Sequence, residues 1–176
     1  MGLRSWMADL GLVSKQQGGP HYEAQPDSPF QYRLEHWDAG RGRGRGYLVV
    51  RNADGQTLSW QTLPRSHGLE SIGVVGEKYQ GRLEALQDGA FSPGRPLQLI
   101  REPKNRYDPN AVAVFDAGST LHVGYLPKGD AARITKKLDA GKDLRCYAIW
   151  ETLEGRRRVQ LRLLLLGENA SVEIQE

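Results

Sequence analysis

The sequence has a single cysteine, Cys146, and four histidines spread along 176 residues. One cysteine excludes a disulfide within the chain and a cysteine-rich zinc site. The histidines do not recur at the short intervals typical of metal ligands, so no metal site is expected. Cys146 lies inside the apolar run CYAIW, where we expect a small, buried and inert side chain.

Long apolar runs and a strong charge of one sign are also missing. No run approaches the roughly 20 residues of a membrane span, and the first residues lack the features of a signal peptide. We therefore expect a cytoplasmic protein without a membrane partner. The formal net charge is only +3, so a role in binding nucleic acid must rest on local patches.

The N-terminal part divides into two segments. Residues 1–29 are predicted to form a short helix followed by a flexible linker rich in glycine and proline. From residue 30 to 70, alternating apolar residues predict a β-meander with a hairpin turn in RNADG. So small a sheet is not stable alone, and we expect it to dock on an outer face formed by Leu164 and Leu166.

The meander contains the segment GRGRGRG, which places Arg41, Arg43 and Arg45 between two predicted strands. Glycines let neighbouring guanidinium groups adapt to a nucleic-acid backbone, so the three arginines are candidate backbone contacts. A flexible, solvated hairpin loop is the alternative, because three repeats are few. The residue types alone do not decide between these two interpretations.

Residues 71–166 alternate short strands with one or two helices. Apolar alternation predicts strands in SIGVVGEKY, PLQLI, AVAVF, LHVGYL, LRCYAIWE and RRVQLRLLLL. KGDAARITKKLDAG predicts a helix that Asp130 caps and Gly141 ends. This order favours a mainly β fold of the α+β kind, a small β-barrel or strongly curved sheet. Residues 167–176 are expected to be a C-terminal tail.

Three motifs follow one another in this region: VVGEKYQGRLEAL, LQLIREPKNRYDPNAVAV and HVGYLPKGDAARI. In this order and spacing they resemble the HIRAN domain, over roughly residues 71–150. The resemblance implies an OB-like small β-barrel and a non-catalytic, nucleic-acid-binding role. Many family members also carry an ATPase and a RING finger. Here there is neither a G-x-x-x-x-G-K-[ST] motif nor a cysteine array, so we expect no enzyme activity and no cofactor.

The resemblance also implies a ligand. In a eukaryotic fork-remodelling translocase the domain binds the 3′-hydroxyl end of single-stranded DNA, which suggests a role in DNA repair or replication. The expected partners are single-stranded DNA, with RNA as an alternative, and a repair or helicase protein. The positions that bind DNA there correspond by motif to Lys78, Tyr79, Asn105, Tyr107, Asp108, Tyr125 and Lys128. Lys78 and Tyr125 depart from the family pattern, where the better-studied member has arginine and histidine.

The residues themselves support a pocket for a chain end. Tyrosines at the ends of three predicted strands can stack on bases, and Lys78, Lys128, Arg101 and Lys104 can neutralise phosphates. Asp108 is the exception, because a carboxylate repels phosphate. It can instead accept a hydrogen bond from a terminal hydroxyl, and it would disfavour a strand that continues through a phosphodiester.

Each of these residues also has a purely structural interpretation. Asp108 begins the tripeptide DPN, in which an aspartate commonly accepts from backbone amides of a turn. Arg101 and Glu102 can form an ion pair at the end of a strand. Asn105 either fixes the loop or bonds to the terminal nucleotide, and Tyr107 alone could be an aromatic residue of the core or rim.

Two other functions remain open. The predicted meander could bind a peptide by strand addition, which would make the protein an interaction adaptor. A nuclease would use Glu102, Asp108 and Asp116, but nothing in the sequence pairs these acids as metal ligands, and no nucleophile–base set is found.

Overall fold

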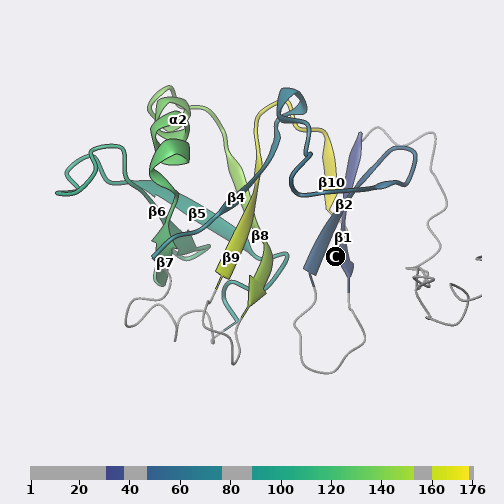
Figure 1. Ribbon diagram of the computed structural model, residues 1–176, viewed down its shortest axis with the longest axis horizontal. Coiled ribbons are helices and arrows are strands. Elements are labelled where there is room, and N and C mark those ends of the chain that lie inside the picture. The colour runs from purple at the N-terminus through teal and green to yellow at the C-terminus, as the bar shows by residue number, and fades with distance from the viewer. Residues whose placement is uncertain (1–30, 38–46, 77–88, 153–159, 175–176) are drawn as a thin grey trace, which may run out of the picture.

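The computed structural model describes residues 31–37, 47–76, 89–152 and 160–174 (Figure 1). The predictions for residues 1–29, for the Arg-Gly segment with its three arginines, and for Lys78 and Tyr79 therefore lie outside the described residues. Two β-sheets and the helix α2 make up most of the described residues. The mainly β fold expected from the sequence is confirmed.

The larger sheet has six strands in the order β4-β9-β8-β5-β6-β7, and all neighbours are antiparallel. The strands are β4 Leu69–Gly73, β5 Pro96–Arg101, β6 Val112–Asp116, β7 His122–Tyr125, β8 Arg145–Thr152 and β9 Gln160–Leu166. Just beyond β4, Val75 pairs with Tyr125 of β7 in an isolated bridge. This bridge joins the two edges of the sheet, so the sheet closes into a small barrel.

The barrel core forms because apolar residues recur at every second position of the strands. Leu161, Leu163 and Leu165 of β9 point into it, together with Val112 and Val114 of β6. Helix α2, Lys128–Asp139, covers one side of this core with its buried residues, Ala131 and Ile134 among them. The helix expected in this segment is therefore confirmed.

The start of α2 differs from the sequence prediction. Its N-cap is Pro127, so Asp130 lies in the first turn and its carboxylate accepts from Arg133 at 3.2 Å. The prediction of Asp130 as the cap was wrong by one turn, because proline is also favoured where a helix begins. The helix ends as expected: Gly141 has a left-handed backbone, with φ +69°, and donates to the Leu138 carbonyl.

The smaller sheet has the strand order β10-β1-β2-β3. Its strands are β1 Tyr32–Trp37, β2 Tyr47–Asn52, β3 Thr57–Leu58 and β10 Val172–Ile174. β1, β2 and β3 form the expected meander, with Gly55 at positive φ in its hairpin turn. The expected C-terminal tail contains β10, which pairs in parallel with β1. It is held there by burial of Val172 and by an ion pair of Glu173 with Arg33, at 2.8 Å.

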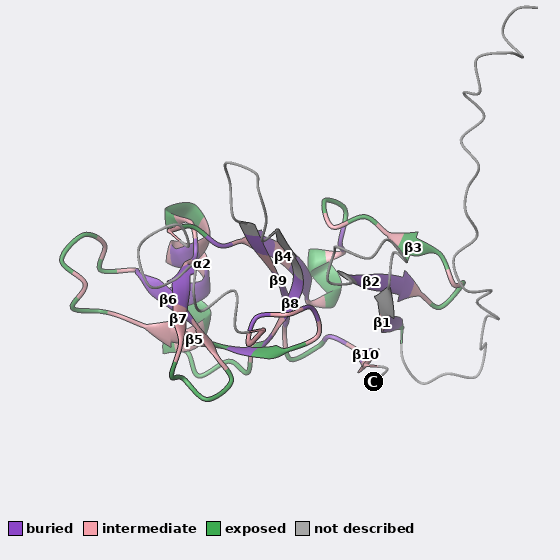
Figure 2. Ribbon diagram, turned by 90° about the horizontal axis from the view of Figure 1, so that it is seen from below, coloured by how far each residue is buried: buried purple, intermediate pink, exposed green. Residues whose placement is uncertain are grey.

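A second core joins the two sheets, and strand β2 of the smaller sheet is accordingly coloured as buried in Figure 2. Leu164 and Leu166 of β9 lie in it with Ile149 of β8, and they pack with Leu34 and Val50 of the smaller sheet. Strand β9 is thus buried on both faces, which explains its nearly continuous run of leucines. The docking surface expected from the alternation of these leucines is the one observed.

Cys146 lies in the barrel core, as its apolar surroundings indicated. Burial raises the pKa of its thiol, so the reactive thiolate is disfavoured. No helix in the described ranges is both long enough and apolar enough to cross a membrane.

Candidate functional site

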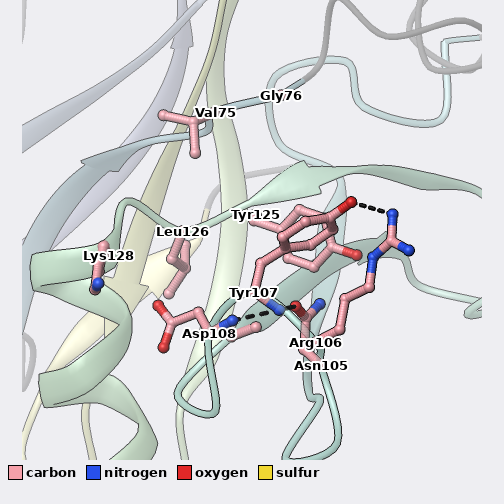
Figure 3. A pocket seen from close by; sticks show the side chains of 10 residues that line it. Val75, Gly76, Asn105, Arg106, Tyr107, Asp108, Tyr125, Leu126 and Lys128 are labelled. Carbon is pink, nitrogen blue, oxygen red and sulfur yellow. Dashed lines mark hydrogen bonds between the residues drawn. The ribbon is translucent and has the colours of Figure 1, made fainter.

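A cleft of about 970 Å³ opens where the barrel closes, beside the first turn of α2 (Figure 3). Five residues singled out from the sequence line it: Asn105, Tyr107, Asp108, Tyr125 and Lys128. The other lining residues are Val75, Gly76, Arg106, Ala111 and Leu126. Segments that are far apart in the sequence therefore meet here: the chain after β4, the loop between β5 and β6, the end of β7 and the start of α2.

The loop between β5 and β6 carries three of the five predicted residues. Its ends are joined by a hydrogen bond of 2.9 Å from the Glu102 amide to the Ala111 carbonyl. Inside the loop, Asn105 Oδ1 accepts from the amides of Tyr107 and Asp108, at 3.0 and 3.4 Å. Asn105 thus fixes the loop, which is the first of the two roles left open for it.

The Glu102 carboxylate connects this loop to β7. It accepts from Asn105 Nδ2 at 2.7 Å and from the Tyr125 hydroxyl at 3.2 Å. From the sequence, Glu102 was a candidate only for an ion pair or for a nuclease acid. Its position in the R-E-P motif, directly after a strand that leads into the loop, was the sequence feature that could have indicated this role.

Arg101 does not pair with Glu102, so the ion pair considered as an alternative is not the one observed. Its guanidinium donates to Asp139 of α2 at 2.8 Å and to the Pro109 carbonyl at 2.6 Å. Successive residues of an extended strand point to opposite sides, which separates Arg101 from its neighbour. Arg101 therefore braces the loop against α2 and does not line the cleft. Lys104 is exposed beside Glu102, in a separate shallow hollow of the surface.

The cleft presents one strongly exposed aromatic ring. The Tyr107 side chain is 76% exposed, and the Arg106 guanidinium lies over its ring, 4.4 Å from the centroid. Arg106 also donates to the Tyr107 hydroxyl (Figure 3). Such a pair combines a stacking surface with a cation. Arg106 was not among the residues predicted from the sequence, although a basic residue directly before an aromatic residue of a loop could have indicated it.

Tyr125 is half-buried, and its ring packs against a histidine as well as bonding to Glu102 through its hydroxyl. The His122 ring meets the Tyr125 ring edge-on, with centroids 4.8 Å apart, and stacks on Phe115 at 4.8 Å. From strand alternation alone, His122 would point away from the face of Tyr125 and be exposed; in the structure it is half-buried between the two rings. The bulge between Val114 and Phe115 shifts the β6–β7 register here, and an alternation pattern does not reveal such a shift.

Two roles were considered for Asp108, one in a backbone turn and one as an acceptor for a ligand hydroxyl, and its position is compatible with both. Its Oδ1 accepts from the Asn110 amide at 2.8 Å, so the expected turn is present. Oδ2 receives no hydrogen bond from the part of the chain that the structure describes. The carboxylate is half-buried and lines the cleft, so one oxygen holds the turn and the other can accept from a ligand.

The third acid considered for a nuclease, Asp116, is used within the turn after β6. Its Oδ1 accepts from the amides of Leu121 and Thr120, both at 2.7 Å. It is not among the residues that line the cleft. Within the described ranges, no three or more histidine, cysteine, aspartate or glutamate side chains are grouped so as to hold a metal ion.

Comparison with known proteins gives a family and two similar structures. The HIRAN domain of human HLTF is 21% identical, with a TM-score of 0.45, over 57% of this chain and 75% of that one. A protein from Lactobacillus plantarum is 24% identical, with a TM-score of 0.46, over 56% and 92%. No curated protein gives a significant match. The HIRAN domain model matches residues 68–165, more than half of the chain. The chain therefore belongs to the HIRAN domain family, a family of nucleic-acid-binding domains.

Proposed function

We propose that the cleft binds the 3′-hydroxyl end of single-stranded DNA. A HIRAN domain is a binding domain rather than a catalytic one, and we assign no chemical step to this chain. The observation that carries the proposal is the set of side chains in the cleft. An exposed tyrosine and two cations, Arg106 and Lys128, lie around one carboxylate, Asp108.

The tyrosine and the cations account for binding to a strand in general. A base stacked on an aromatic ring contributes about 1–3 kcal/mol, with little preference for sequence. Neither Arg106 nor Lys128 forms an ion pair with any described carboxylate. Both cations are therefore available to phosphates, and binding would weaken as salt increases.

The carboxylate accounts for a preference for the end of the strand. A terminal hydroxyl can donate to Asp108 Oδ2, whereas a phosphate at that place brings a second negative charge. Two such charges about 4 Å apart repel by about 1 kcal/mol in water and about 4 kcal/mol near a protein surface. A 3′-phosphate would therefore bind at least about fivefold more weakly than a 3′-hydroxyl.

Fluorescence anisotropy with a short 5′-labelled strand tests the proposal. The strand ends in either a 3′-hydroxyl or a 3′-phosphate, and the proteins are wild type, Asp108→Ala and Asp143→Ala. Asp143 is an exposed aspartate outside the cleft and serves as the matched control. We expect wild type and the control to prefer the hydroxyl end, and Asp108→Ala to lose that preference. Equal binding of both ends by the wild type would overturn the proposal.

A ribonucleotide at the 3′ end extends the same experiment to RNA, because only a 2′-hydroxyl is added. The biological setting that we propose is DNA repair or replication, where free 3′ ends occur, with a repair or helicase protein as a further partner. Peptide binding by strand addition has less support. The smaller sheet ends on β3, whose two residues, Thr57 and Leu58, give a short edge for a peptide to pair with.

A further inference from the structure

We infer that Glu102 sets the direction of the hydrogen bond at Tyr125, and thereby makes Tyr125 a selector for ligand groups that donate. Glu102 is then a positioning residue, since it acts on the ligand through the tyrosine. The inference rests on the proposed function, because it specifies how the cleft distinguishes a terminal hydroxyl from a phosphate.

The backbone holds Glu102 in place independently of any ligand. Its amide donates to the Ala111 carbonyl at 2.9 Å, which extends the β5–β6 ladder by one pair beyond Arg101 and Val112. Its own carbonyl accepts from the Asn105 amide at 3.0 Å. The carboxylate then lies against the end of β7. The Tyr125 hydroxyl is shared between its two oxygens, at 3.2 and 3.5 Å.

The chemistry of the two groups fixes which of them donates. A carboxylate only accepts hydrogen bonds, whereas a phenol has one proton to donate and lone pairs to accept with. The Tyr125 proton is therefore directed to Glu102. Toward a ligand, the phenolic oxygen of Tyr125 can act only as an acceptor. A hydroxyl of the ligand satisfies it, but an ionised phosphate oxygen opposes it, because both atoms would be acceptors.

The same carboxylate orients Asn105. Asn105 Nδ2 donates to Glu102, so its Oδ1 faces the amides of Tyr107 and Asp108. Only this orientation of the amide satisfies all three contacts. The cleft thus contains two acceptors, Tyr125 and Asp108, while the cations Arg106 and Lys128 remain for the phosphates of the strand.

A substitution that keeps the shape of Glu102 separates this role from packing. In Glu102→Gln, the side-chain oxygen can keep the short bond from Asn105. That oxygen is also the nearer one to the Tyr125 hydroxyl, at 3.2 Å, while the amide nitrogen takes the place of the oxygen 3.5 Å away. The tyrosine then faces a neutral acceptor, which binds its proton more weakly than a carboxylate does, and a new donor. Its proton is therefore held less firmly and can also be donated to a phosphate. The negative charge is not needed for an ion pair with Arg101, which is held by Asp139.

The test is the ratio of the affinities for strands with a 3′-hydroxyl and a 3′-phosphate, measured by anisotropy. The proteins are wild type, Glu102→Gln, Tyr125→Phe and the double variant. Urea unfolding verifies that each is folded, and Tyr125→Phe tests the same hydroxyl if Glu102→Gln is unstable. We expect either single variant to lower the ratio by about 2- to 10-fold, the worth of one hydrogen bond. We expect the double variant to match Tyr125→Phe, because the two residues act in series.

Two results would overturn the inference in different ways. If the wild type prefers the hydroxyl end but Glu102→Gln and Tyr125→Phe keep that preference, the inference fails and the proposed function stands. If the double variant lowered the affinity ratio by the full sum of the two single effects, Glu102 would likewise not act through Tyr125. If the wild type has no preference, the proposed function fails, and the role of Glu102 fails with it.

Discussion

Val75 and Tyr125 exchange two backbone hydrogen bonds, of 2.8 and 2.9 Å, and this pair closes the six-stranded sheet into a barrel. The residue before Tyr125 is Gly124. A Cβ atom built there would lie 2.5 Å from the Val75 carbonyl oxygen and 2.5 Å from Val74 Cγ1. The two backbones can approach this closely because position 124 has no side chain. Since Val75 and Tyr125 also line the cleft, the shape of the cleft depends on the same contact.

Gly124→Ala should therefore destabilise the protein. Inserting a methyl group into so close a contact costs about 1–3 kcal/mol, and urea unfolding would measure the loss. Gly129→Ala is the matched control, because nothing lies within 4 Å of a Cβ built at position 129, in the first turn of α2. Alanine there should leave stability unchanged or raise it by about 0.5–1 kcal/mol. Equal stabilities of the two variants would show that the contact at Gly124 is not tight.

Much of the barrel could be predicted from the sequence, because alternation along a strand assigns its residues to two faces. In β9 the alternation separated Leu163, in the barrel core, from Leu164, in the core between the sheets. Strand β10 was missed because Val172–Ile174 is too short to show a period. Its position depends on contacts such as that between Arg33 and Glu173, which are 140 positions apart.

The site was only partly predictable, and for a different reason. The motif identified loop residues that line the cleft, such as Tyr107 and Asp108. It gave no information on which neighbours contact one another. Arg101 and Glu102 are adjacent in sequence and opposite in charge, so an ion pair between them was one of the possible interpretations. The strand directs one to α2 and the other to Tyr125, and only the fold reveals these separate partners.

Lys128→Ala should weaken strand binding and make it less dependent on salt. Each phosphate neutralised on a single strand contributes about 0.7 to the slope of log affinity against log salt. Loss of one contact should therefore lower that slope by about 0.7, as measured by anisotropy titrations between low and physiological salt. Lys137→Ala is the control, since Lys137 is exposed on the same helix but does not line the cleft. The same change of slope in both variants would mean that Lys128 has no specific contact.

Asp116 should make the stability depend on pH in the acid range. The pKa of Asp116 is lowered, chiefly by the hydrogen bond from the Leu121 amide and further by those from Thr120 and Gly118. A group whose pKa is lower in the folded state stabilises that state above its unfolded pKa, about 3.9. The stabilisation is lost as pH falls through the lower, folded value. The window therefore lies below about pH 4.

Asp116→Asn is accordingly expected to lower the free energy of unfolding at pH 7 and to differ less from wild type near pH 3. Urea unfolding at several pH values would measure both differences. Asp143→Asn, at an exposed position, is the control for the substitution itself and should leave the free energy of unfolding at pH 7 close to that of the wild type. A deficit of Asp116→Asn that stayed constant down to pH 3 would mean that the turn depends on the shape of the side chain and not on its charge.

Tyr107 provides the clearest separation of stacking from hydrogen bonding. Its side chain is 76% exposed, so Tyr107→Ala and Tyr107→Phe should both melt close to the wild-type temperature. Tyr107→Ala removes the ring and should cost about 1–3 kcal/mol of binding free energy for a single strand. Tyr107→Phe keeps the ring and removes only the hydroxyl to which Arg106 donates, so it should retain most of the affinity. If Tyr107→Phe lost as much as Tyr107→Ala, the hydroxyl rather than the ring face would be the binding group. Unchanged affinity in Tyr107→Ala would mean that no base stacks on this ring.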